Sequence, residues 1–432
     1  MVRRYYSRAI QVWPISMKTR TTGDVWDVVV IGGGPAGMIA AATAAARGKT
    51  VLLLEKNQTL GKKLLITGGG RCNVTNNKTE IRHMLGQYGD AAKFLFSAFA
   101  QHAVSDTIEW FRTRGVSFVE ENDGRLFPES NSAQTIFATL VHTLEETGVT
   151  IRTRAAVAQI LQNDGGFVVT LATGEMITTM HVIVASGGTS RPETGATGDG
   201  FQWLSALGHQ VVPNNYSLVP LRCSDSWVPL ISGVTLRDVK ITLWADAKKQ
   251  SAHVGKILFT HVGLSGPTIL NLSKTVGDML QHSAVTITVN LLPQFDAGAL
   301  KAKLRELFSV SSNKMLKNAL TELLPSAIVP PLLYLAAVDG DTPCHSVRTA
   351  ERTLLAQLIA ALPLHITGLQ GADKAIVSSG GVAPDEVNFK TMESRVTSGL
   401  FVVGDMLDIN RPSGGYSLQL CWTTGFVAGS HV

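Results

Sequence analysis

The sequence lacks any apolar run long enough to cross a membrane. A membrane-spanning helix needs about 20 consecutive apolar residues, whereas the longest uncharged apolar stretches, such as VTITVNLLP, have the length of a β-strand. We therefore predict no membrane span.

Cysteine is also scarce, with four widely separated residues and no CxxC pair. This spacing argues against a disulfide framework and against a structural zinc site, so we expect no metal and a reducing, cytoplasmic compartment.

The excess of positive charge does not belong to the body of the chain. The formal net charge is +5, from 38 basic and 33 acidic residues. Residues 1–23 contain no acid and hold five of the basic residues: Arg3, Arg4, Arg8, Lys18 and Arg20. The rest of the chain therefore has 33 basic and 33 acidic residues. The neutral remainder gives no argument from bulk charge for a nucleic-acid binder. We expect residues 1–23 to be a disordered extension, either an organelle-targeting segment or the product of an upstream start with Met17 beginning the functional chain.

Glycine is abundant instead, and its most informative cluster follows a short apolar run near the N-terminus. In DVVVIGGGPAGMIAAATAAARGKTVLLLEKN, Val28–Ile31 have the continuous apolar character of a strand that is buried on both faces. Gly32, Gly34 and Gly37 then have the G-x-G-x-x-G spacing that permits a tight turn, close approach of a pyrophosphate and close helix packing. Glu55 ends a second apolar strand, where an acid accepts hydrogen bonds from ribose hydroxyls. The segment predicts a dinucleotide-binding βαβ unit.

Later segments favour FAD over a nicotinamide dinucleotide, because FAD is longer and requires the chain to return to it. GVTIRTRAAVAQI indicates a strand ending near Val157, placed to touch adenine through its backbone, and HVIVASGG is an apolar strand that closes on a glycine pair. LFVVGD ends in Asp405, which can hold a ribityl hydroxyl at the carboxyl end of a buried strand. Gly415 and Tyr416 then open a helix whose N-terminus stabilises negative charge on the flavin. A second G-x-G-x-x-G motif is absent, so a nicotinamide donor would bind without a recognisable site of its own.

A further glycine-rich stretch, GKKLLITGGGRCNVTN, lies between these segments. We expect the backbone N–H groups of Gly68–Gly70 to approach the flavin ring with no side chain between them. A basic neighbour would offset phosphate charge, and Cys72 would lie near the reacting face. The full set of residues that we expect to bind FAD is Gly32, Gly34, Ala36, Gly37, Glu55, Lys56, Lys62, Lys63, Gly69, Gly70, Arg71, Cys72, Asn73, Val157, Gly187, Gly404, Asp405, Gly415, Tyr416, Ser417 and Leu418.

Several strings make the chain similar to one known family. They are IGGGPAGM, GKKLLITGGGRCNVTN, GRLFPESNSAQTI, LFTHVGLSGPTIL, SSGGV and GDMLDINRPSGGYSLQ, and they are distributed from residue 24 to the C-terminus. With them the chain resembles the bacterial aminoacetone-oxidase-like, NAD(P)/FAD-dependent oxidoreductase flavoproteins. The resemblance implies non-covalent FAD, a discontinuous FAD domain and an inserted β-rich domain with a small helical cap. The chain departs from the family in its additional leading residues.

The residues themselves predict the same architecture, an α/β fold with a Rossmann-like FAD-binding domain and an inserted β-barrel-like domain. Short apolar runs alternate with turn residues from about 205 to 295, as in a barrel or sandwich, and the pattern becomes helical from 297 to about 361. We place the FAD domain at 24–200 and 380–432, the β-rich domain at 201–295 and 363–379, and the helical subdomain at 296–362.

Two side chains are candidates for catalysis. Cys72 can protonate a carbon while the flavin delivers hydride to its neighbour, although a free cysteine more often only packs in the core. His261, in a glycine-rich loop of the inserted domain, is a candidate substrate ligand or proton donor, and a structural role in its loop is the alternative.

Three functions remain open at this point. The first is an FAD-dependent reductase that takes hydride from NADH or NADPH and saturates an activated C=C bond of a small molecule or, as parts of the family suggest, of uridine in ribosomal RNA. The second is an oxidase of a small amine such as aminoacetone that uses O2. The third is a flavin redox sensor or RNA-binding protein without turnover. The oligomeric state does not follow from the sequence.

Overall fold

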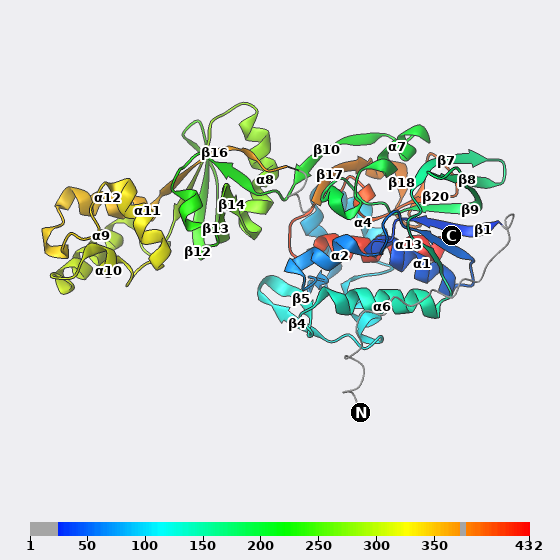
Figure 1. Cartoon of the computed structure of the whole chain (residues 1–432), viewed down its shortest axis with the longest axis horizontal. Helices are drawn as coiled ribbons and strands as arrows, with labels where there is room; N and C mark the ends of the chain where they lie inside the picture. The colour runs from blue at the N-terminus through cyan, green and yellow to red at the C-terminus, as the bar shows by residue number, and fades with distance from the viewer. Residues whose placement is uncertain (1–24, 372–376) are drawn as a thin grey trace.

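A parallel sheet forms the centre of the larger part of the molecule. The structure is a computed structural model that describes residues 25–371 and 377–432. Five parallel strands lie side by side in the order β20, β9, β1, β2 and β6, with bounds Leu400–Val402, Met176–Val184, Trp26–Ile31, Val51–Leu54 and Thr150–Arg152. Their apolar residues are buried on both faces, as in Val28, Val29 and Val30, because helices cover the sheet (Figure 1).

The five strands end at one row of residues. Val402 pairs with Val184, Val184 with Ile31, Ile31 with Leu54, and Leu54 with Arg152. All of these pairings are parallel, so the loops that leave the strands emerge from the same edge of the sheet. Ligands of open α/β sheets bind at this edge.

Antiparallel strands extend the sheet on one side of this core, the side of β9 that faces away from β1. The hairpin of β7 (Val157–Asn163) and β8 (Gly166–Leu171) adds to the first half of β9, and β18 (Val387–Asn388) and β19 (Glu393–Ser394) lie beyond β20. A separate small sheet joins β3 (Thr75–Asn76), β5 (Arg125–Pro128) and β4 (Phe118–Glu121).

Helices α1 (Pro35–Ala46) and α13 (Tyr416–His431) pack together beside the parallel sheet. A Cβ at Gly425 would lie 2.4 Å from the carbonyl oxygen of Ala36, and one at Gly429 would lie 2.4 Å from that of Ala40. The two backbones are therefore closer than side chains would allow. The remaining helices of this part are α2 (Lys62–Ile66), α3 (Ile81–Leu85), α4 (Ala92–Phe99), α5 (Val104–Arg112), α6 (Ala133–Glu146) and α7 (Asp199–Ala206).

A closed antiparallel barrel forms the second part of the molecule. Its strands run in the order β11, β14, β13, β12, β15 and β16, with bounds Leu221–Cys223, Gly263–Ser265, Lys248–Thr260, Thr235–Ala245, Val285–Asn290 and Leu362–Leu369. Alternate residues face its core, among them Ile241 and Ile287, which have no exposed surface. Helix α8 (Pro267–Leu280) packs against the barrel, within the segment 201–295 that the sequence predicts to be β-rich.

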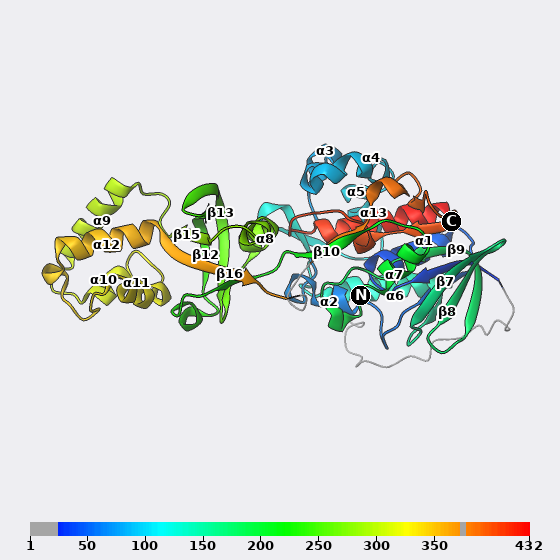
Figure 2. The ribbon, with the colours of Figure 1, turned by 90° about the horizontal axis from the view of Figure 1, so that it is seen from above.

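A cluster of helices is carried by the barrel on the side away from the parallel sheet (Figure 1). It consists of α9 (Ala297–Val310), α10 (Leu316–Leu320), α11 (Val329–Ala336) and α12 (Thr349–Ala360). The antiparallel pair β10 (Val211–Ser217) and β17 (Val377–Val382) lies where the barrel joins the larger part (Figure 1), and β10 is seen there from above in Figure 2. The predicted fold class is confirmed, whereas the predicted domain boundaries stay predictions.

Two sequence predictions fall wholly or partly outside the described residues. These are the N-terminal extension, residues 1–23, and part of the β-rich segment 363–379. Among the residues that the structure does describe, no helix has the length and apolar character needed to span a membrane.

Candidate functional site

The glycine turn after β1 is folded tightly on itself. The N–H of Gly32 donates to the Leu54 carbonyl at 2.8 Å, and a Cβ at Gly32 would lie 2.4 Å from the carbonyl oxygen of Ala185. A Cβ at Gly37 would lie 1.9 Å from the Gly32 carbonyl oxygen. At Gly34, by contrast, nothing lies within 4 Å of the Cβ position. The turn thus leaves open space beside the N-terminus of α1, where backbone N–H groups favour a phosphate.

Glu55 stands at the end of β2 beside this turn. One carboxylate oxygen accepts from the Gly33 N–H at 2.8 Å, and the other accepts from the backbone N–H and the side-chain amide of Asn57 at 2.8 and 2.7 Å. The side chain is buried, with 8% of its surface exposed. The acid is therefore held in place at the edge of the sheet where a ribose would meet it.

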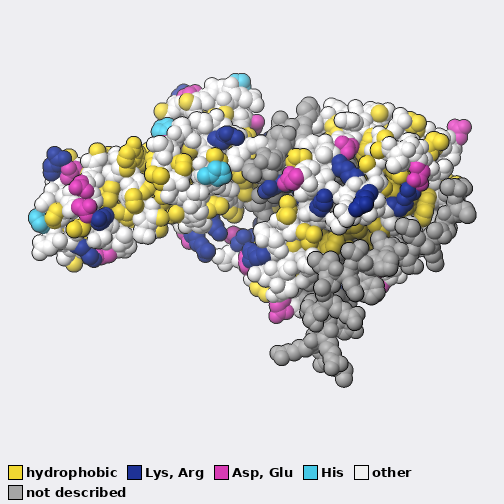
Figure 3. Space-filling view, viewed as in Figure 1, with side chains coloured by type: hydrophobic (Ala, Val, Ile, Leu, Met, Phe, Trp, Pro, Cys, Tyr) yellow, Lys and Arg dark blue, Asp and Glu magenta, His cyan; other side chains and the backbone are white. Residues whose placement is uncertain are grey.

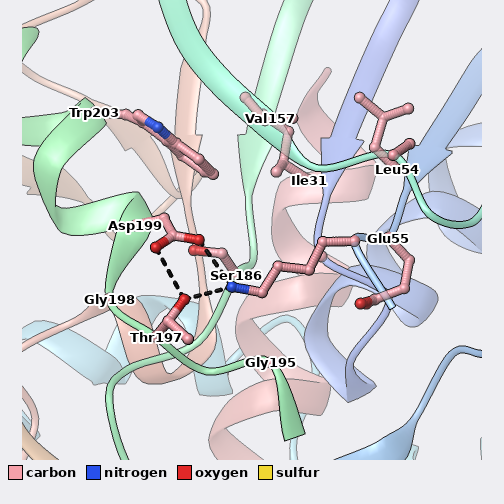
Figure 4. A pocket seen from close by; sticks show the side chains of 13 residues that line it. Ile31, Leu54, Glu55, Val157, Ser186, Gly195, Thr197, Gly198, Asp199 and Trp203 are labelled. Carbon is pink, nitrogen blue, oxygen red and sulfur yellow. Dashed lines mark hydrogen bonds and ion pairs between the residues drawn. The ribbon is translucent and has the colours of Figure 1, made fainter. Parts of the chain in front are cut away.

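A narrow cavity opens next to Glu55. Its lining includes Leu54, Val157 and Trp203, together with the loop 195–199 that follows β9 (Figure 4). The indole N–H of Trp203 donates to the Ala158 carbonyl at 3.1 Å, which fixes the ring at the cavity wall. The predicted adenine contact, Val157, thus lies in this lining, but sequence reasoning missed Trp203.

Lys56 joins the two sides of this cavity. Its Nζ lies 2.8 Å from Oδ2 of Asp199 and also contacts the Thr197 hydroxyl. The Asp199 carboxylate accepts from the Thr197 hydroxyl at 2.9 Å as well. Burial raises the pKa of Asp199, but the hydrogen bonds from Lys56 and Thr197 outweigh it and hold the pKa below its usual value. We call this cluster, Lys56, Thr197 and Asp199, the latch.

The second glycine-rich stretch exposes bare backbone. Gly68, Gly69 and Gly70 all have positive φ, at 58°, 70° and 87°, and all three are exposed. No atom lies within 4 Å of the Cβ position at Gly69 or Gly70. This is the unobstructed backbone that the approach of a flat ring requires.

Cys72 follows with its thiol turned into the core. It has no exposed surface and a positive φ of 61°, and its N–H donates to the Thr67 carbonyl at 3.0 Å. Burial raises the pKa of the thiol to about 12, although its hydrogen bond with the Thr67 side chain acts in the opposite direction. The thiol is therefore protonated at physiological pH and does not face open space. Its predicted role as a proton donor stays a prediction.

The three basic side chains of this stretch have different partners. Lys62 donates to Oδ1 of Asn57 at 3.0 Å. The Arg71 guanidinium pairs with Glu121 at 2.7 Å and lies 4.1 Å from the ring centroid of Phe127. These two side chains are thus engaged with other groups, and the third, Lys63, reaches the loop that follows β20.

Asp405 lies between Lys63 and Arg411 at the end of β20. Lys63 Nζ is 3.3 Å from Oδ2 of Asp405, and the Arg411 guanidinium contacts Oδ1. Burial alone would raise the pKa of this carboxyl, but the two cations outweigh burial and lower the pKa. Arg411 also donates to the Ser417 hydroxyl at 3.0 Å, within the first turn of α13. Asp405 is thus an ionised acceptor beside that turn.

The N-terminus of α13 rests on the second glycine-rich stretch. A Cβ at Gly415, where φ is 100°, would lie 2.4 Å from the carbonyl carbon of Thr75. With the Asn73 amide turned so that its oxygen faces the Gly415 N–H, that oxygen accepts from it at 3.0 Å. On the other side, a Cβ at Gly404 would lie 3.0 Å from the Cβ of Ala36 in α1. Segments that are distant in the sequence therefore converge on the edge of the parallel sheet.

The residues at this edge fit FAD. The Trp203 cavity and Glu55 suit the adenosine, and the open space at Gly34 beside the start of α1 suits the pyrophosphate. The open backbone at Gly69 and Gly70, with the N-terminus of α13, suits the isoalloxazine ring. Among the other predicted contacts, Gly187 has φ of 77° in the loop after β9, and Tyr416 and Leu418 are buried in the first turn of α13. The individual contacts with FAD stay predictions.

A larger cavity of about 570 Å³ lies where the barrel meets the parallel-sheet part. Its walls come from residues 87–94, from 408–412 and from one face of α8, with Lys93 and Lys274 contributed by the two parts. Asn271 of α8 accepts from the N–H and the hydroxyl of Ser413 at 2.9 and 3.1 Å, so α8 contacts the loop that precedes α13. His261 is exposed in the turn between β13 and β14 and does not belong to the lining of either cavity, and its role also stays a prediction.

Comparisons with known proteins agree with this architecture. Residues 26–431 match the family described as HI0933-like protein Rossmann domain. The open conformation of a flavocytochrome c3 fumarate reductase has a TM-score of 0.52 at 19% identity, covering 95% of this chain and 78% of that one. A 3-ketosteroid delta1-dehydrogenase from Sterolibacterium denitrificans has a TM-score of 0.54 at 13% identity, covering 94% and 99%. At these identities the two structures show a shared fold.

Two full-length relatives are more similar in sequence. The ribosomal RNA dihydrouridine synthase of Escherichia coli is 31% identical over 402 residues, which cover 93% of this chain and 96% of the relative. The 3-dehydro-bile acid delta(4,6)-reductase of Clostridium scindens is 29% identical over 404 residues, which cover 93% and 97%. The finer resemblance to aminoacetone-oxidase-like proteins stays a prediction. The chain belongs to the HI0933-like Rossmann-domain family, and it is a flavin-dependent oxidoreductase.

Proposed function

We propose that the protein is a reductase that saturates an activated carbon–carbon double bond with hydride supplied by NADH or NADPH. The observation that carries the proposal is the pair of relatives aligned over nearly the whole chain. Their names denote the formation of a dihydrouridine and the reduction of a delta(4,6) bile acid, both of which saturate C=C bonds. The two acceptors differ greatly in size and charge, so the shared feature is the bond and not the molecule.

The residues at the sheet edge serve such a reaction through position and charge. Bound FAD would supply the two-electron chemistry. The N-terminus of α13 would hold negative charge at the pyrimidine edge of the ring. Asp405, kept ionised by Lys63 and Arg411, would accept a hydrogen bond from the ribityl chain. The open backbone at Gly69 and Gly70 would leave one face of the ring accessible.

The larger cavity is the proposed acceptor site. It lies at the junction of the two parts of the molecule, where pockets are common, and its lining includes Arg411, which contacts Ser417 at the start of α13. In its lining Lys93, Lys274 and Arg411 outnumber the acids Asp90 and Asp408, which suits an anionic acceptor such as a uridine within RNA. On the face shown in Figure 3, however, basic and acidic side chains are interspersed, so that face has no extended field of one sign.

Anaerobic reduction of the flavin tests the proposal. The purified yellow protein is mixed under argon with NADH, with NADPH or with aminoacetone, and loss of the visible flavin absorbance is followed. Acceptors are then added: ribosomal RNA that lacks dihydrouridine, a neutral steroid enone, and O2. We expect reduction by one nicotinamide and reoxidation by an acceptor with a C=C bond much faster than by O2.

Two results would contradict the reductase. Reduction of the flavin by aminoacetone and not by either nicotinamide, with rapid O2 consumption, would identify an amine oxidase. No reduction by any donor would favour the sensor. Chemical reduction with dithionite is the control, because it shows that the bound flavin can be reduced at all.

A further inference from the structure

A buried polar network joins α13 to β3, at the C-terminal end of the second glycine-rich stretch. The hydroxyl of Thr75 in β3 donates to Oε1 of Gln419 at 2.6 Å. One helical turn further along α13, the indole N–H of Trp422 donates to the Val74 carbonyl at 2.9 Å. All three side chains have no exposed surface. The side chains of α13 thus bind directly to the segment on which its own N-terminus rests.

Gln419 is the centre of this network. Its amide nitrogen donates to the hydroxyls of Thr107 at 2.8 Å and Thr423 at 3.0 Å. The Thr107 hydroxyl lies 3.1 Å from Nε2 of His102, and the Thr423 hydroxyl donates to the His102 carbonyl at 2.9 Å. The amide therefore has its oxygen committed to β3 and its nitrogen committed to α5 and to α13 itself. A buried amide with fixed partners on both sides has one orientation.

We propose that the Thr75–Gln419 hydrogen bond is a positioning link that fixes the direction of the α13 N-terminus against the second glycine-rich stretch. Through this link, Gln419 sets how strongly the site stabilises reduced FAD relative to oxidised FAD. The inference rests on the proposed function only in taking the N-terminus of α13 as the group that faces the flavin. Thr75 and Gln419 are positioning residues, since neither lines the cavities described above.

The physical reason lies in the direction of the helix dipole. The N-terminus of a helix carries roughly half a positive charge, and its effect falls off within the first turn. Gln419 lies in that turn, so a change in its bond to β3 moves the N–H groups of the turn relative to Gly69 and Gly70. Reduction adds negative charge to the flavin. A shift of these N–H groups therefore changes the affinity for reduced FAD more than the affinity for oxidised FAD.

Two isosteric substitutions separate the link from general packing. Thr75→Val removes the hydroxyl that joins β3 to Gln419. Thr423→Val removes a second buried hydroxyl that bonds to the same amide. That hydroxyl belongs to α13 itself and donates to the His102 carbonyl, so it does not join α13 to β3. Thr75→Ser keeps the donor and serves as the rescue. Thr75→Cys, a weaker donor of similar size, is a further variant should Thr75→Val not fold. The readouts are the flavin midpoint potential from chemical titration and the thermal midpoint of each variant.

We expect Thr75→Val to weaken binding of reduced FAD three- to tenfold more than binding of oxidised FAD, where tenfold corresponds to about 30 mV for a two-electron couple. The potential should become more negative, and Thr75→Cys should lie between it and the wild type. Thr423→Val and Thr75→Ser should keep the wild-type potential. Equal shifts in Thr75→Val and Thr423→Val, or no shift in Thr75→Val with FAD bound, would overturn the inference. The titration needs neither a nicotinamide nor an acceptor, so it remains decisive even if the reductase proposal fails.

Discussion

At the scale of single residues, the latch shows how a side chain beside the predicted motif acquires a role from the fold. Lys56 directly follows Glu55, and both were predicted to bind the cofactor. Asp199 was not predicted, and neither was Trp203, because both lie in a part of the sequence with no recognisable dinucleotide motif. Their place in the cavity beside Glu55 follows from the pairing of β9 with β1 in the sheet. The glycine-rich ATGDG string, residues 196–200, is a turn signal that marks this loop in the sequence.

Loss of the latch should accelerate the release of FAD. Lys56→Met and Asp199→Asn each remove the charge pair that holds the loop 195–199 across the cavity, whose partners are 2.8 Å apart. We expect each single variant to release FAD about fivefold faster, the size of an exposed ion pair worth about 1 kcal/mol. Release is measured from the fluorescence of free flavin after dilution. The double variant should release FAD no faster than the singles, and additive effects would show that the two side chains act separately.

At the scale of elements, the strands and helices with a clear pattern of apolar residues were predictable from the sequence, but the way they pack together was not. The apolar runs of β1, β2 and β20 indicated buried parallel strands, and the structure places them in one sheet. Helix α8 escaped prediction because its residues lie among strands, although Pro267 at its first position is a helix-start signal. The close contact of α1 with α13 depends on Gly425 and Gly429, whose spacing acquires meaning only once the partner helix is known.

This close contact should be intolerant of a single methyl group. In Gly425→Ala the new Cβ would lie 2.4 Å from the carbonyl oxygen of Ala36, so α1 and the adjacent glycine turn must shift. We expect a loss of about 1–3 kcal/mol in the free energy of unfolding, as for overpacked cores, and weaker FAD binding. Thermal unfolding with and without added FAD measures both effects.

Gly298→Ala is the matched control for that substitution. Gly298 lies in α9, far from the parallel sheet, and the nearest atom to its Cβ position is Oδ1 of Asp296 at 3.4 Å. Alanine is the better helix former, so this variant should be as stable as the wild type or more so by up to about 1 kcal/mol. A similar loss in both variants would mean that the helix contact at Gly425 is not the cause.

At the scale of the whole molecule, the sequence indicated two units but not the space between them. The larger cavity takes residues from 87–94, α8 and 408–412, and none of these segments carries a motif of its own for a substrate. The contact of Asn271 with Ser413 that brings α8 to the loop before α13 is equally invisible in the sequence. The FAD end of the site was predictable because glycine and strand patterns encode it locally. The proposed acceptor cavity was not, because it is formed where two parts with separate hydrophobic cores meet.

The two lysines at this junction should favour a charged acceptor over a neutral one. Lys93 comes from the parallel-sheet part and Lys274 from the helix α8 that packs on the barrel. With Arg411 they outnumber the two acids of the lining, Asp90 and Asp408, so an acceptor in the cavity meets an excess of positive charge. We expect Lys93→Met and Lys274→Met each to raise the KM for an RNA acceptor about fivefold at low salt, with little change in kcat, since an exposed charge contributes up to about 1 kcal/mol. The effect should shrink at high salt because ions screen exposed charges.

Lys301→Met, on the exposed surface of α9 in the helical cluster, is the control and should leave KM unchanged. A neutral enone acceptor should be insensitive to all three substitutions. If both cavity variants instead raise the KM for the neutral acceptor as much as the KM for RNA, the lysines maintain the shape of the cavity and do not bind the acceptor through its charge.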